Sequence, residues 1–405
     1  MKQGWEIKKL SEIGRIFNGN SINEKVKKEN YTCLDDGLPF IATKDISFNS
    51  LIDYENGVKI PFVEKSQFKI APPNTPLICA EGGSAGRKIG YTNQDVCFGN
   101  KLFALVPNKN VESKYVFYYY FTSGFQKHFS SGIAGLIGGV SLNKFKGIEI
   151  PIPPLHEQHC IVAILDEAFA AIARAKANAE QNLKNVRELF ESYLQELFME
   201  LVQQNDNIPI YYIADVIGGF SFKSSDFKKD GTYQVIRMGN VRPGVIREEE
   251  NPVFIDKMEK KTLNKALLQP NDVIITQTGT KKKRDYGYTA IINKENYLLN
   301  QRIAAIRFSD KYLPKFFLYF SWTNIFKDQY FASETGTVGQ GNVGIGAITD
   351  SLVPFLSISE QHSIVKKLDN LSSETKKLET IYQQKLNDLD ELKKSILKKA
   401  FNGEL

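Results

Sequence analysis

The stretch PLHEQHCIVAILDEA, residues 154–168, has a close counterpart later in the chain, SISEQHSIVKKLDNL, residues 357–371. The Glu-Gln-His cores of the two stretches begin at Glu157 and Glu360, an offset of 203 residues. An internal match of this length is the first sign of a duplicated unit.

Further matches extend the repeat over the chain. KLSEIG near Leu10 is echoed by YIADVIG near Ile213, again at an offset of 203. APPNTPLICAEGGSAGRKIGYT (71–92) aligns with LQPNDVIITQTGTKKKRDYGYT (268–289) at an offset of 197, which pairs Arg87 with Arg284 and Gly-Tyr-Thr with Gly-Tyr-Thr. The chain therefore consists of two diverged copies of one unit of about 200 residues.

The two histidines and the cysteine of LHEQHC raise the question of a metal site. The second copy has Ser359 in place of His156 and Ser363 in place of Cys160, and the histidines are spaced i, i+3 instead of the i, i+4 of the metalloprotease helix. We therefore expect no metal site and interpret the stretch as a helix start, with Ser357 and Glu360 forming a capping box.

A long amphipathic helix is predicted after each Glu-Gln-His core. Apolar residues recur at steps of three and four for some ten turns, and no proline interrupts either run. The residues expected to pack the helices together are Ile161, Leu165, Ile172, Leu183, Val186 and Leu189 in the first, and Ile364, Leu368, Leu371, Leu378, Leu386, Leu389 and Leu392 in the second.

A helix of about 45 residues is roughly 65 to 70 Å long and cannot bury its apolar stripe within a small domain. We expect the two helices to pack on each other as an antiparallel coiled coil, although a parallel pair satisfies the same pattern.

The segments between the helices have a different character, with short Val-, Ile-, Phe- and Tyr-rich runs between Gly, Pro and Asn turns. They predict two α+β domains. The expected organisation is a first domain at 1–152, a central helix at 153–206, a second domain at 207–355 and a C-terminal helix at 356–405.

The composition is that of a folded globular protein, with 42% hydrophobic and 12% aromatic residues. The N-terminus resembles no signal peptide, no stretch is apolar enough to span a bilayer, and four scattered cysteines suit a reducing compartment, so we expect a cytoplasmic protein. A net charge of +6 permits polyanion binding without requiring it.

No catalytic signature is recognisable. GQGNVG (339–344) satisfies G-x-G-x-x-G but lies among other glycines without the flanking strand and helix of a dinucleotide site, so we interpret it as a glycine-rich loop. No phosphate-binding loop, nucleophile elbow or methyltransferase motif is present. We expect a chain that performs no covalent chemistry.

Several polar loops are candidates for DNA contact. The aligned loops at 81–92 and 277–289 contain Arg side chains, which suit guanine or phosphate, and a Lys tract, which suits phosphate. Two further sets follow predicted strands, in ATKDIS and IRMGNVRPG and in GNKLFA and NQRIAA. For each set a solvated surface turn is the alternative. The candidates are Thr43, Lys44, Arg87, Lys88, Lys101, Arg237, Asn240, Arg242, Lys281, Lys282, Lys283, Arg284, Gln301 and Arg302.

These features together resemble the specificity subunit of type I restriction-modification systems. The resemblance is carried by two variable domains alternating with two long helices, by PIPPLHEQHCIV and its partner PFLSISEQHSIV, and by AFNGEL at the C-terminus. It covers the whole chain.

The resemblance implies that each variable domain reads one half of a split, asymmetric target in double-stranded DNA. It implies that the helices set the spacing and bind two methyltransferase subunits, with restriction subunits joining the full complex. S-adenosylmethionine, ATP and Mg are then expected on those partners and not on this chain. The alternative is a non-catalytic coiled-coil adaptor whose end domains bind proteins.

Overall fold

The computed structural model describes residues 2–134, 138–256, 258–337 and 339–405. The chain forms two compact units, unit 1 (residues 1–180 with 384–405) and unit 2 (residues 181–383). The division passes through both long helices, α6 (Leu155–Gln204) and α11 (Ile358–Asn402), so each unit contains part of each helix.

Unit 1 is built on a four-stranded antiparallel sheet in the order β2-β9-β6-β7 and a second sheet in the order β4-β3-β8-β5. Its strands are β1 (Glu6–Lys9), β2 (Gly14–Asn18), β3 (Leu38–Ile41), β4 (Lys59–Ile60), β5 (Ile70–Ala71), β6 (Pro76–Cys79), β7 (Ile89–Tyr91), β8 (Val96–Phe98), β9 (Leu102–Pro107) and β10 (Glu149–Ile152). Its shorter helices are α1 (Leu10–Ile13), α2 (Glu24–Asn30), α3 (Ser113–Tyr119), α4 (Ser123–Ser131) and α5 (Leu142–Lys146).

Unit 2 repeats this topology, with the sheets β12-β21-β17-β19 and β16-β13-β20. Its strands are β11 (Asn207–Pro209), β12 (Ala214–Gly218), β13 (Tyr233–Ile236), β14 (Val241–Arg242), β15 (Val245–Ile246), β16 (Phe254–Ile255), β17 (Val273–Thr276), β18 (Thr278–Gly279), β19 (Thr289–Ile291), β20 (Tyr297–Leu299), β21 (Ile303–Phe308), β22 (Thr335–Thr337), β23 (Gln340–Asn342) and β24 (Leu352–Pro354). Its shorter helices are α7 (Lys260–Ala266), α8 (Pro314–Ser321), α9 (Asn324–Ala332) and α10 (Ile345–Thr349). The predicted α+β class and internal repeat are confirmed.

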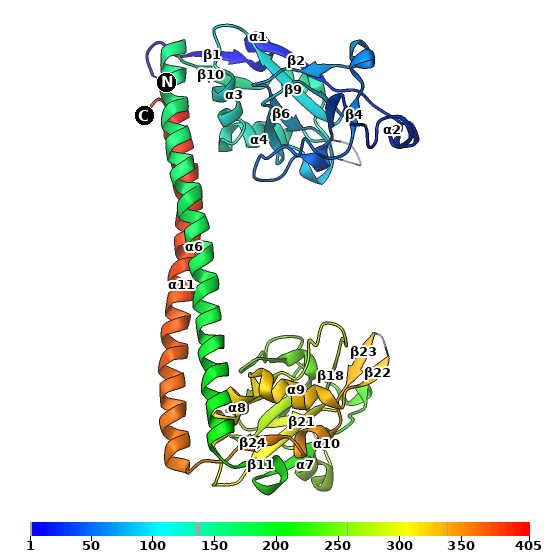
Figure 1. Cartoon of the computed structure of the whole chain (residues 1–405), viewed down its shortest axis with the longest axis vertical. Helices are drawn as coiled ribbons and strands as arrows, with labels where there is room; N and C mark the ends of the chain where they lie inside the picture. Colours follow the sequence, from blue (N-terminus) through cyan, green and yellow to red (C-terminus); the bar gives the residue numbers. More distant parts are fainter. Residues whose placement is uncertain (1, 135–137, 257, 338) are drawn as a thin grey trace. The chain divides into compact units, whose positions relative to one another are not determined.

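The aromatic helices α3 and α8 lie between the main sheet of their unit and the long helices (Figure 1). The structure buries Val116 of α3 and Tyr120, the C-cap of that helix. It also buries Phe316 and Phe320 of α8. The next helix begins in the same way in both units, because Thr122 and Thr323 accept a hydrogen bond from the backbone N–H three residues later. These aromatic side chains form the core and are not available to stack on bases.

The repeated glutamine of the Glu-Gln-His core fixes the start of each long helix. Gln158 is fully buried, accepts a hydrogen bond from the Glu112 N–H (2.8 Å) and donates to the carbonyls of Pro153 (2.8 Å) and Asn110 (3.3 Å). A buried amide whose oxygen and both N–H groups are hydrogen-bonded leaves few alternative conformations for the helix start.

Gln361 makes the matching contacts in unit 2. It accepts from the Leu313 N–H (2.8 Å) and donates to the carbonyls of Leu356 (2.9 Å) and Lys311 (3.1 Å). The predicted capping box is also present, with Ser357 N–H donating to the Glu360 carboxylate (3.0 Å) and Glu360 N–H to the Ser357 hydroxyl (3.4 Å). The stretch that repeats in the sequence is therefore a duplicated structural anchor.

A repeated aspartate adds a second anchor two turns further on. In unit 1, Asp166 accepts hydrogen bonds from Lys114 (2.7 Å) and from the Tyr118 hydroxyl. In unit 2, Asp369 accepts from Lys315 (2.8 Å) and the Tyr319 hydroxyl (2.6 Å). Both long helices are thus held to the aromatic helix of their unit by the same three side-chain types.

The long helices run antiparallel, as predicted. Within unit 1, Lys176 of α6 pairs with Asp390 of α11 at 2.5 Å. Within unit 2, Arg187 of α6 lies 3.4 Å from Glu379 of α11. Higher numbers in one helix face lower numbers in the other, which is the register of antiparallel partners.

Three of the predicted packing residues are not packed, and this part of the prediction is corrected. The exposed fractions of Leu189, Leu378 and Leu392 are 65%, 42% and 47%. Among the other predicted positions, Ile161, Leu165, Ile172 and Leu368 are buried, whereas Leu183, Val186, Ile364, Leu371, Leu386 and Leu389 are half-buried.

The prediction took a step of three residues along the helix where the packed face continues after a step of four. After Val186 the packed face continues at Phe190 and Leu194, not at Leu189, because an α-helix turns every 3.6 residues. In α11 the corresponding inner positions hold charged residues, Glu379 and Lys393, which a search for leucines passes over.

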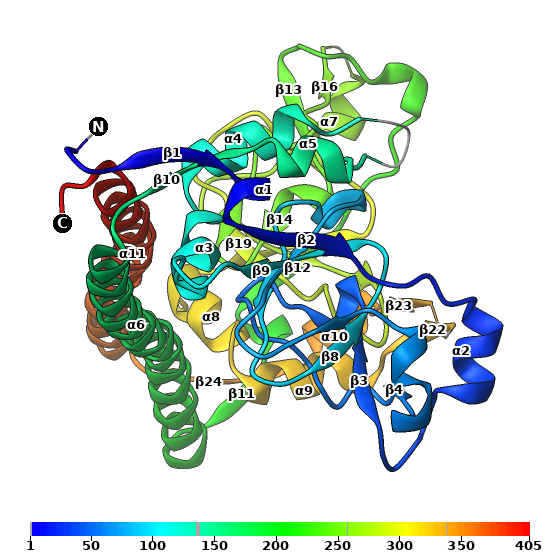
Figure 2. The ribbon, with the colours of Figure 1, turned by 90° about the horizontal axis from the view of Figure 1, so that it is seen from above.

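The end of α11 closes onto the beginning of the chain within unit 1. Trp5 shares a buried cluster with Leu397 and Phe401 of α11, and a Cβ added at Gly403 would lie 2.9 Å from Lys2 and 3.3 Å from the Trp5 ring. Lys2 also forms an ion pair with Glu157 at the start of α6, at 2.5 Å. Both views show the beginning of the described chain, which leads into β1, beside the end of α11 (Figures 1 and 2). In the part of the chain that the structure describes, no helix is long and apolar enough to cross a membrane.

Candidate nucleic-acid interface

Each unit contains a pair of parallel neighbouring strands whose carboxyl ends meet at one edge. In unit 1, Ile41 of β3 pairs with Phe98 of β8, and in unit 2, Ile236 of β13 pairs with Leu299 of β20. The predicted polar sets follow these strands directly. Parallel strands end at the same edge, so the fold brings two of the three predicted sets together in each unit.

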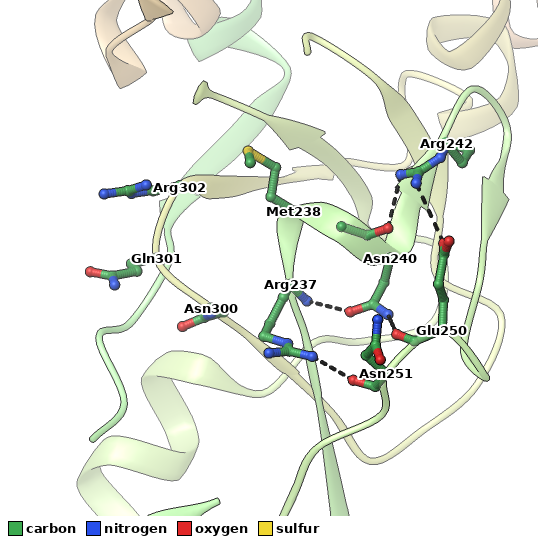
Figure 3. A pocket seen from close by; sticks show the side chains of 10 residues that line it. Arg237, Met238, Asn240, Arg242, Glu250, Asn251, Asn300, Gln301 and Arg302 are labelled. Atoms are coloured by element: carbon green, nitrogen blue, oxygen red, sulfur yellow. Dashed lines mark hydrogen bonds and ion pairs between the residues drawn. The ribbon is translucent and has the colours of Figure 1, made fainter. Parts of the chain in front are cut away.

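In unit 2 the turns after β13 and β20 enclose an open hollow of about 640 Å³. Figure 3 shows Asn300, Gln301 and Arg302 on one side of it, across from Arg237 and Asn251. The lining residues are Arg237, Met238, Gly239, Asn240, Arg242, Glu250, Asn251, Asn300, Gln301 and Arg302. Arginine, glutamine and asparagine are the side chains that hydrogen-bond base edges, so the composition suits nucleic acid.

Asn240 does not have the predicted role of a base contact. Its exposed fraction is 2%, its amide donates to the carbonyls of Glu250 (2.7 Å) and Arg247 (3.1 Å), and its side-chain oxygen accepts from the Arg237 N–H (3.0 Å). The prediction is corrected because both amide hydrogens are used inside the protein. Asp45 makes the matching contact in unit 1, because its carboxylate accepts from the N–H three residues earlier, that of Ala42, at 2.8 Å.

The two arginines that the sequence analysis predicted after β13, Arg237 and Arg242, are partly held by hydrogen bonds within the protein. The Arg237 guanidinium donates to the Asn251 carbonyl, and Arg242 donates to the carbonyls of Gly239 (2.8 Å) and Val241 (2.9 Å). Glu250 lies 3.4 Å from Arg242. A guanidinium has five N–H donors, so each retains donors for a ligand while its direction is fixed.

Arg302 is the most exposed cation of the hollow, and its backbone is fixed. Its φ is 69°, in the left-handed region, and its carbonyl accepts from the Gln277 N–H at 2.9 Å. The neighbouring Gln301 N–H donates to the Phe220 carbonyl, also at 2.9 Å. Such a conformation in a residue other than glycine costs about 1 to 3 kcal/mol and persists because the surrounding hydrogen bonds hold it.

In unit 1 the candidates gather around the exposed ring of Phe48. Lys88 donates to the Thr43 carbonyl at 2.9 Å, which joins two of the predicted sets. The Arg87 guanidinium and the Lys88 ammonium lie 5.0 and 5.4 Å from the Phe48 ring centre. Lys101 is exposed and 3.9 Å from Glu81. A cationic surface with an aromatic ring is therefore present at the equivalent edge of unit 1.

The hydrogen-bond register corrects the predicted alignment of the loops between β6 and β7 and between β17 and β19. Gly86 N–H donates to the Cys79 carbonyl (2.8 Å), and Gly287 N–H donates to the Thr276 carbonyl (2.9 Å). Both glycines have positive φ, 72° and 76°. They are the true counterparts, so the loop of unit 2 is longer and the shared Gly-Tyr-Thr letters do not occupy equivalent positions.

Arg87 and Arg284 are consequently not equivalent residues. Arg87 directly follows Gly86, whereas Arg284 precedes Gly287 by three residues. Arg284 packs over the Phe331 ring at 4.8 Å and lines a different hollow of unit 2, together with Trp322. The structure thus places it apart from the Arg237 and Arg302 side of the unit.

The lysine tract belongs to the same longer loop. Lys282 and Lys283 are exposed and Lys281 is half-buried. The Thr280 N–H and hydroxyl donate to the Asp285 carboxylate at 2.6 and 3.1 Å, and the backbone hydrogen bond is the main reason that the pKa of this carboxyl is lowered. The loop is closed at its base and presents Lys282 and Lys283 outward.

Some lining residues escaped the sequence analysis. Met238, Glu250, Asn251 and Asn300 line the hollow of unit 2, and Phe48 organises the cations of unit 1. Met238 adjoins the predicted Arg237 and Asn300 adjoins the predicted Gln301, so a wider window would have included both. Glu250, Asn251 and Phe48 leave no local signal, because they reach the site only through the fold.

A known family matches the chain in two places. The family is described as "Type I restriction modification DNA specificity domain", and it matches residues 2–184 and 206–388. The chain belongs to this family. Each match includes one α+β domain and the first part of the long helix that follows it.

Relatives in this family are type I restriction enzyme specificity subunits. The EcoKI specificity subunit of Escherichia coli strain K12 is 25% identical over 426 residues, which cover 100% of this chain and 90% of the relative. The StySPI specificity subunit of Salmonella potsdam is 24% identical over 434 residues, with the same two coverages.

Solved structures have the same fold. A chain from the work "Structural basis underlying complex assembly and conformational transition of the type I R-M system" superposes with a TM-score of 0.78 at 15% identity, covering 100% of this chain and 99% of the other. The HsdS subunit from Thermoanaerobacter tengcongensis superposes with a TM-score of 0.63 at 17% identity, covering 100% and 98%.

Proposed function

We propose that this chain is the DNA specificity subunit of a type I restriction-modification complex, in which each unit reads one half of a split, asymmetric target in double-stranded DNA. The proposal is carried by a difference between two equivalent places in the fold. Two units of the same topology present different side chains from the same pair of turns, with Arg302 in unit 2 where unit 1 has Lys101.

Different side chains at equivalent positions are what two different half-sites require. Arg suits guanine and Gln suits adenine, whereas the Lys ammonium is a point charge on a flexible chain and lacks the rigid fork of a guanidinium. The remaining exposed cations, among them Lys282 and Lys283, suit phosphates, which position the protein without specifying a sequence. The net charge of +6 agrees with a polyanionic ligand.

The partners follow from the same proposal. The long helices connect the two readers and set the spacing between half-sites, and their outer faces bind two methyltransferase subunits, which restriction subunits join in the full complex. S-adenosylmethionine, ATP and Mg belong to those subunits, and this chain performs no covalent chemistry. The specificity subunits named among the relatives support this division of labour.

The test is co-expression of the full chain with the methyltransferase subunit of its own system, followed by mass determination and mapping of methylated adenines. We expect a complex of two methyltransferase subunits with one copy of this chain, and methylation of a split, asymmetric target. A stable chain that binds no such subunit and leaves DNA unmarked would refute the proposal and favour an adaptor whose end domains bind proteins.

A further inference from the structure

The glycine-rich stretch GQGNVG forms part of a small three-stranded antiparallel sheet in unit 2, in the order β18-β23-β22. Thr337 pairs with Gln340 across the hairpin of β22 and β23, and Thr278 of β18 pairs with Asn342 of β23. Much of the stretch is thus a paired strand, β23, which corrects the glycine-rich loop predicted from the sequence.

This β22–β23 hairpin is joined directly to the candidate interface. The Gln277 N–H donates to the Arg302 carbonyl at 2.9 Å, and the Val343 N–H donates to the Gln277 carbonyl at the same distance. The Gln277 amide, which is buried, donates back to the Val343 carbonyl at 3.0 Å. One residue therefore connects the hairpin to the most exposed cation of the hollow.

The repeat retains this connection in unit 1. The Ala80 N–H donates to the Lys101 carbonyl at 2.8 Å, and the Val140 N–H donates to the Ala80 carbonyl at 2.9 Å. The sequence that precedes Val140 is AGLIGG, residues 134–139, and contains neither glutamine nor asparagine. Both units therefore connect a segment to the turn after the parallel strands at this position, but only in unit 2 does the sequence of that segment contain glutamine and asparagine.

The root of the hairpin is held firmly. The Thr278 hydroxyl donates to the Asn342 side-chain oxygen at 2.8 Å, and the buried Tyr286 donates its hydroxyl to the Glu334 carboxylate. A Cβ added at Gly341 would lie 2.3 Å from the Tyr286 hydroxyl oxygen, so the ring packs directly against the ribbon. A rigid support of this kind fixes the direction of the side chains beyond it.

The exposed part of the hairpin presents neutral hydrogen-bonding groups. Thr337 and Gln340 are exposed, and the carboxylate of the neighbouring Glu334 is already bonded to Tyr286. A two-stranded ribbon is narrow enough to enter the major groove of B-DNA, and a glutamine amide matches the N6 and N7 atoms of adenine with two hydrogen bonds.

We propose that the β22–β23 hairpin enters the major groove at the half-site read by unit 2 and that Gln340 reads an adenine there. This assignment rests on the proposed function. It adds a reading element that the base-contact residues predicted from the sequence did not include, and it assigns that element to one half-site only.

The experiment uses the full chain in complex with its methyltransferase subunit. For Gln340→Ala we expect methylation of the native target to fall about 5- to 150-fold, with the requirement for one adenine in the second half-site relaxed and the first half-site unchanged. Gln269→Ala is the matched control, because this exposed glutamine belongs to the same unit but lies in the turn before β17, outside the long helices and the hollow, and we expect it to leave the target unchanged.

A second variant gives a directional result. Glu accepts a hydrogen bond from the N4 amino group of cytosine, so Gln340→Glu should shift the preferred base at that position from adenine toward cytosine. An unchanged target and rate in both variants would overturn the assignment. So would an equal loss on all DNA with a shallower salt dependence, which is the behaviour of a phosphate contact. A wild-type complex that marks no split target would instead refute the proposed function itself.

Discussion

Units 1 and 2 differ most where their side chains are exposed and least where hydrogen bonds are buried. Gln158 and Gln361 make the same three kinds of contact, at nearly the same distances. At the edge of the parallel strands, by contrast, Lys101 corresponds to Arg302. The buried anchors define one framework, and the turns after the strands vary on it, which is what two readers of different half-sites need.

The comparison also has an internal exception. At the start of β17 the buried Asp272 forms two hydrogen bonds with Arg307, at 2.8 and 2.7 Å, and this contact raises the pKa of the arginine further. The start of β6 holds Thr75 at the corresponding place, with its N–H donating to the Thr92 hydroxyl at 2.8 Å. Framework positions can therefore differ chemically while the strands remain equivalent.

We expect the largest effect from a substitution that removes the buried glutamine anchor common to both units. Gln361→Ala leaves three backbone groups without their partner, and each buried group left unpaired costs about 1 to 3 kcal/mol, so we expect a loss of about 3 to 5 kcal/mol in the free energy of unfolding. Gln158→Ala should cost the same amount. Urea denaturation measures both, with the exposed His362→Ala as control. Markedly unequal losses would mean that the two anchors are not equivalent.

The next effect concerns Asp272, whose ion pair with Arg307 occurs in unit 2 where unit 1 has Thr75. Asp272→Ala leaves a partly buried guanidinium without its carboxylate, and we expect a loss of about 2 to 4 kcal/mol, somewhat below a fully buried pair because Arg307 is partly exposed. Thr75→Ala in unit 1 should cost less than about 1 kcal/mol. Thermal unfolding of the two variants checks this order, and a larger loss at Thr75 would contradict it.

The third prediction separates function from stability. Arg302→Gly removes the cation while placing glycine at a φ of 69°, so the fold should be unharmed or slightly stabilised. Binding to the second half-site should weaken by about 1 to 3 kcal/mol. Lys101→Ala should weaken recognition of the first half-site instead. DNA binding to targets altered in one half at a time distinguishes these outcomes, and a loss at the wrong half-site would refute the assignment.

The smallest effect tests which face of α6 is packed. Leu189→Ala should change the free energy of unfolding by less than about 0.5 kcal/mol, because the side chain is 65% exposed. Leu194→Ala, at a buried position in the same helix, should cost about 2 to 5 kcal/mol. The same denaturation experiment compares them, and a large loss for Leu189 would restore the stripe predicted from the sequence.

The repeat, the α+β class and the two long antiparallel helices were all accessible from the sequence. Residues that pack in regular elements recur at fixed spacing, and duplicated residues such as Gln158 and Gln361 betray duplicated roles even before their contacts are known. The positions of the polar turns after strands were also predicted correctly, because strand and turn residues alternate locally.

The tertiary structure alone decided which side of a turn or helix faces inward. Asn240 is buried by carbonyls from Arg247 and Glu250, and Leu189 yields its place to Phe190, whose ring packs against Tyr319 of α8. The loop register between β17 and β19 is likewise set by hydrogen bonds across strands. These outcomes depend on contacts between distant parts of the chain, and local spacing carries no record of them.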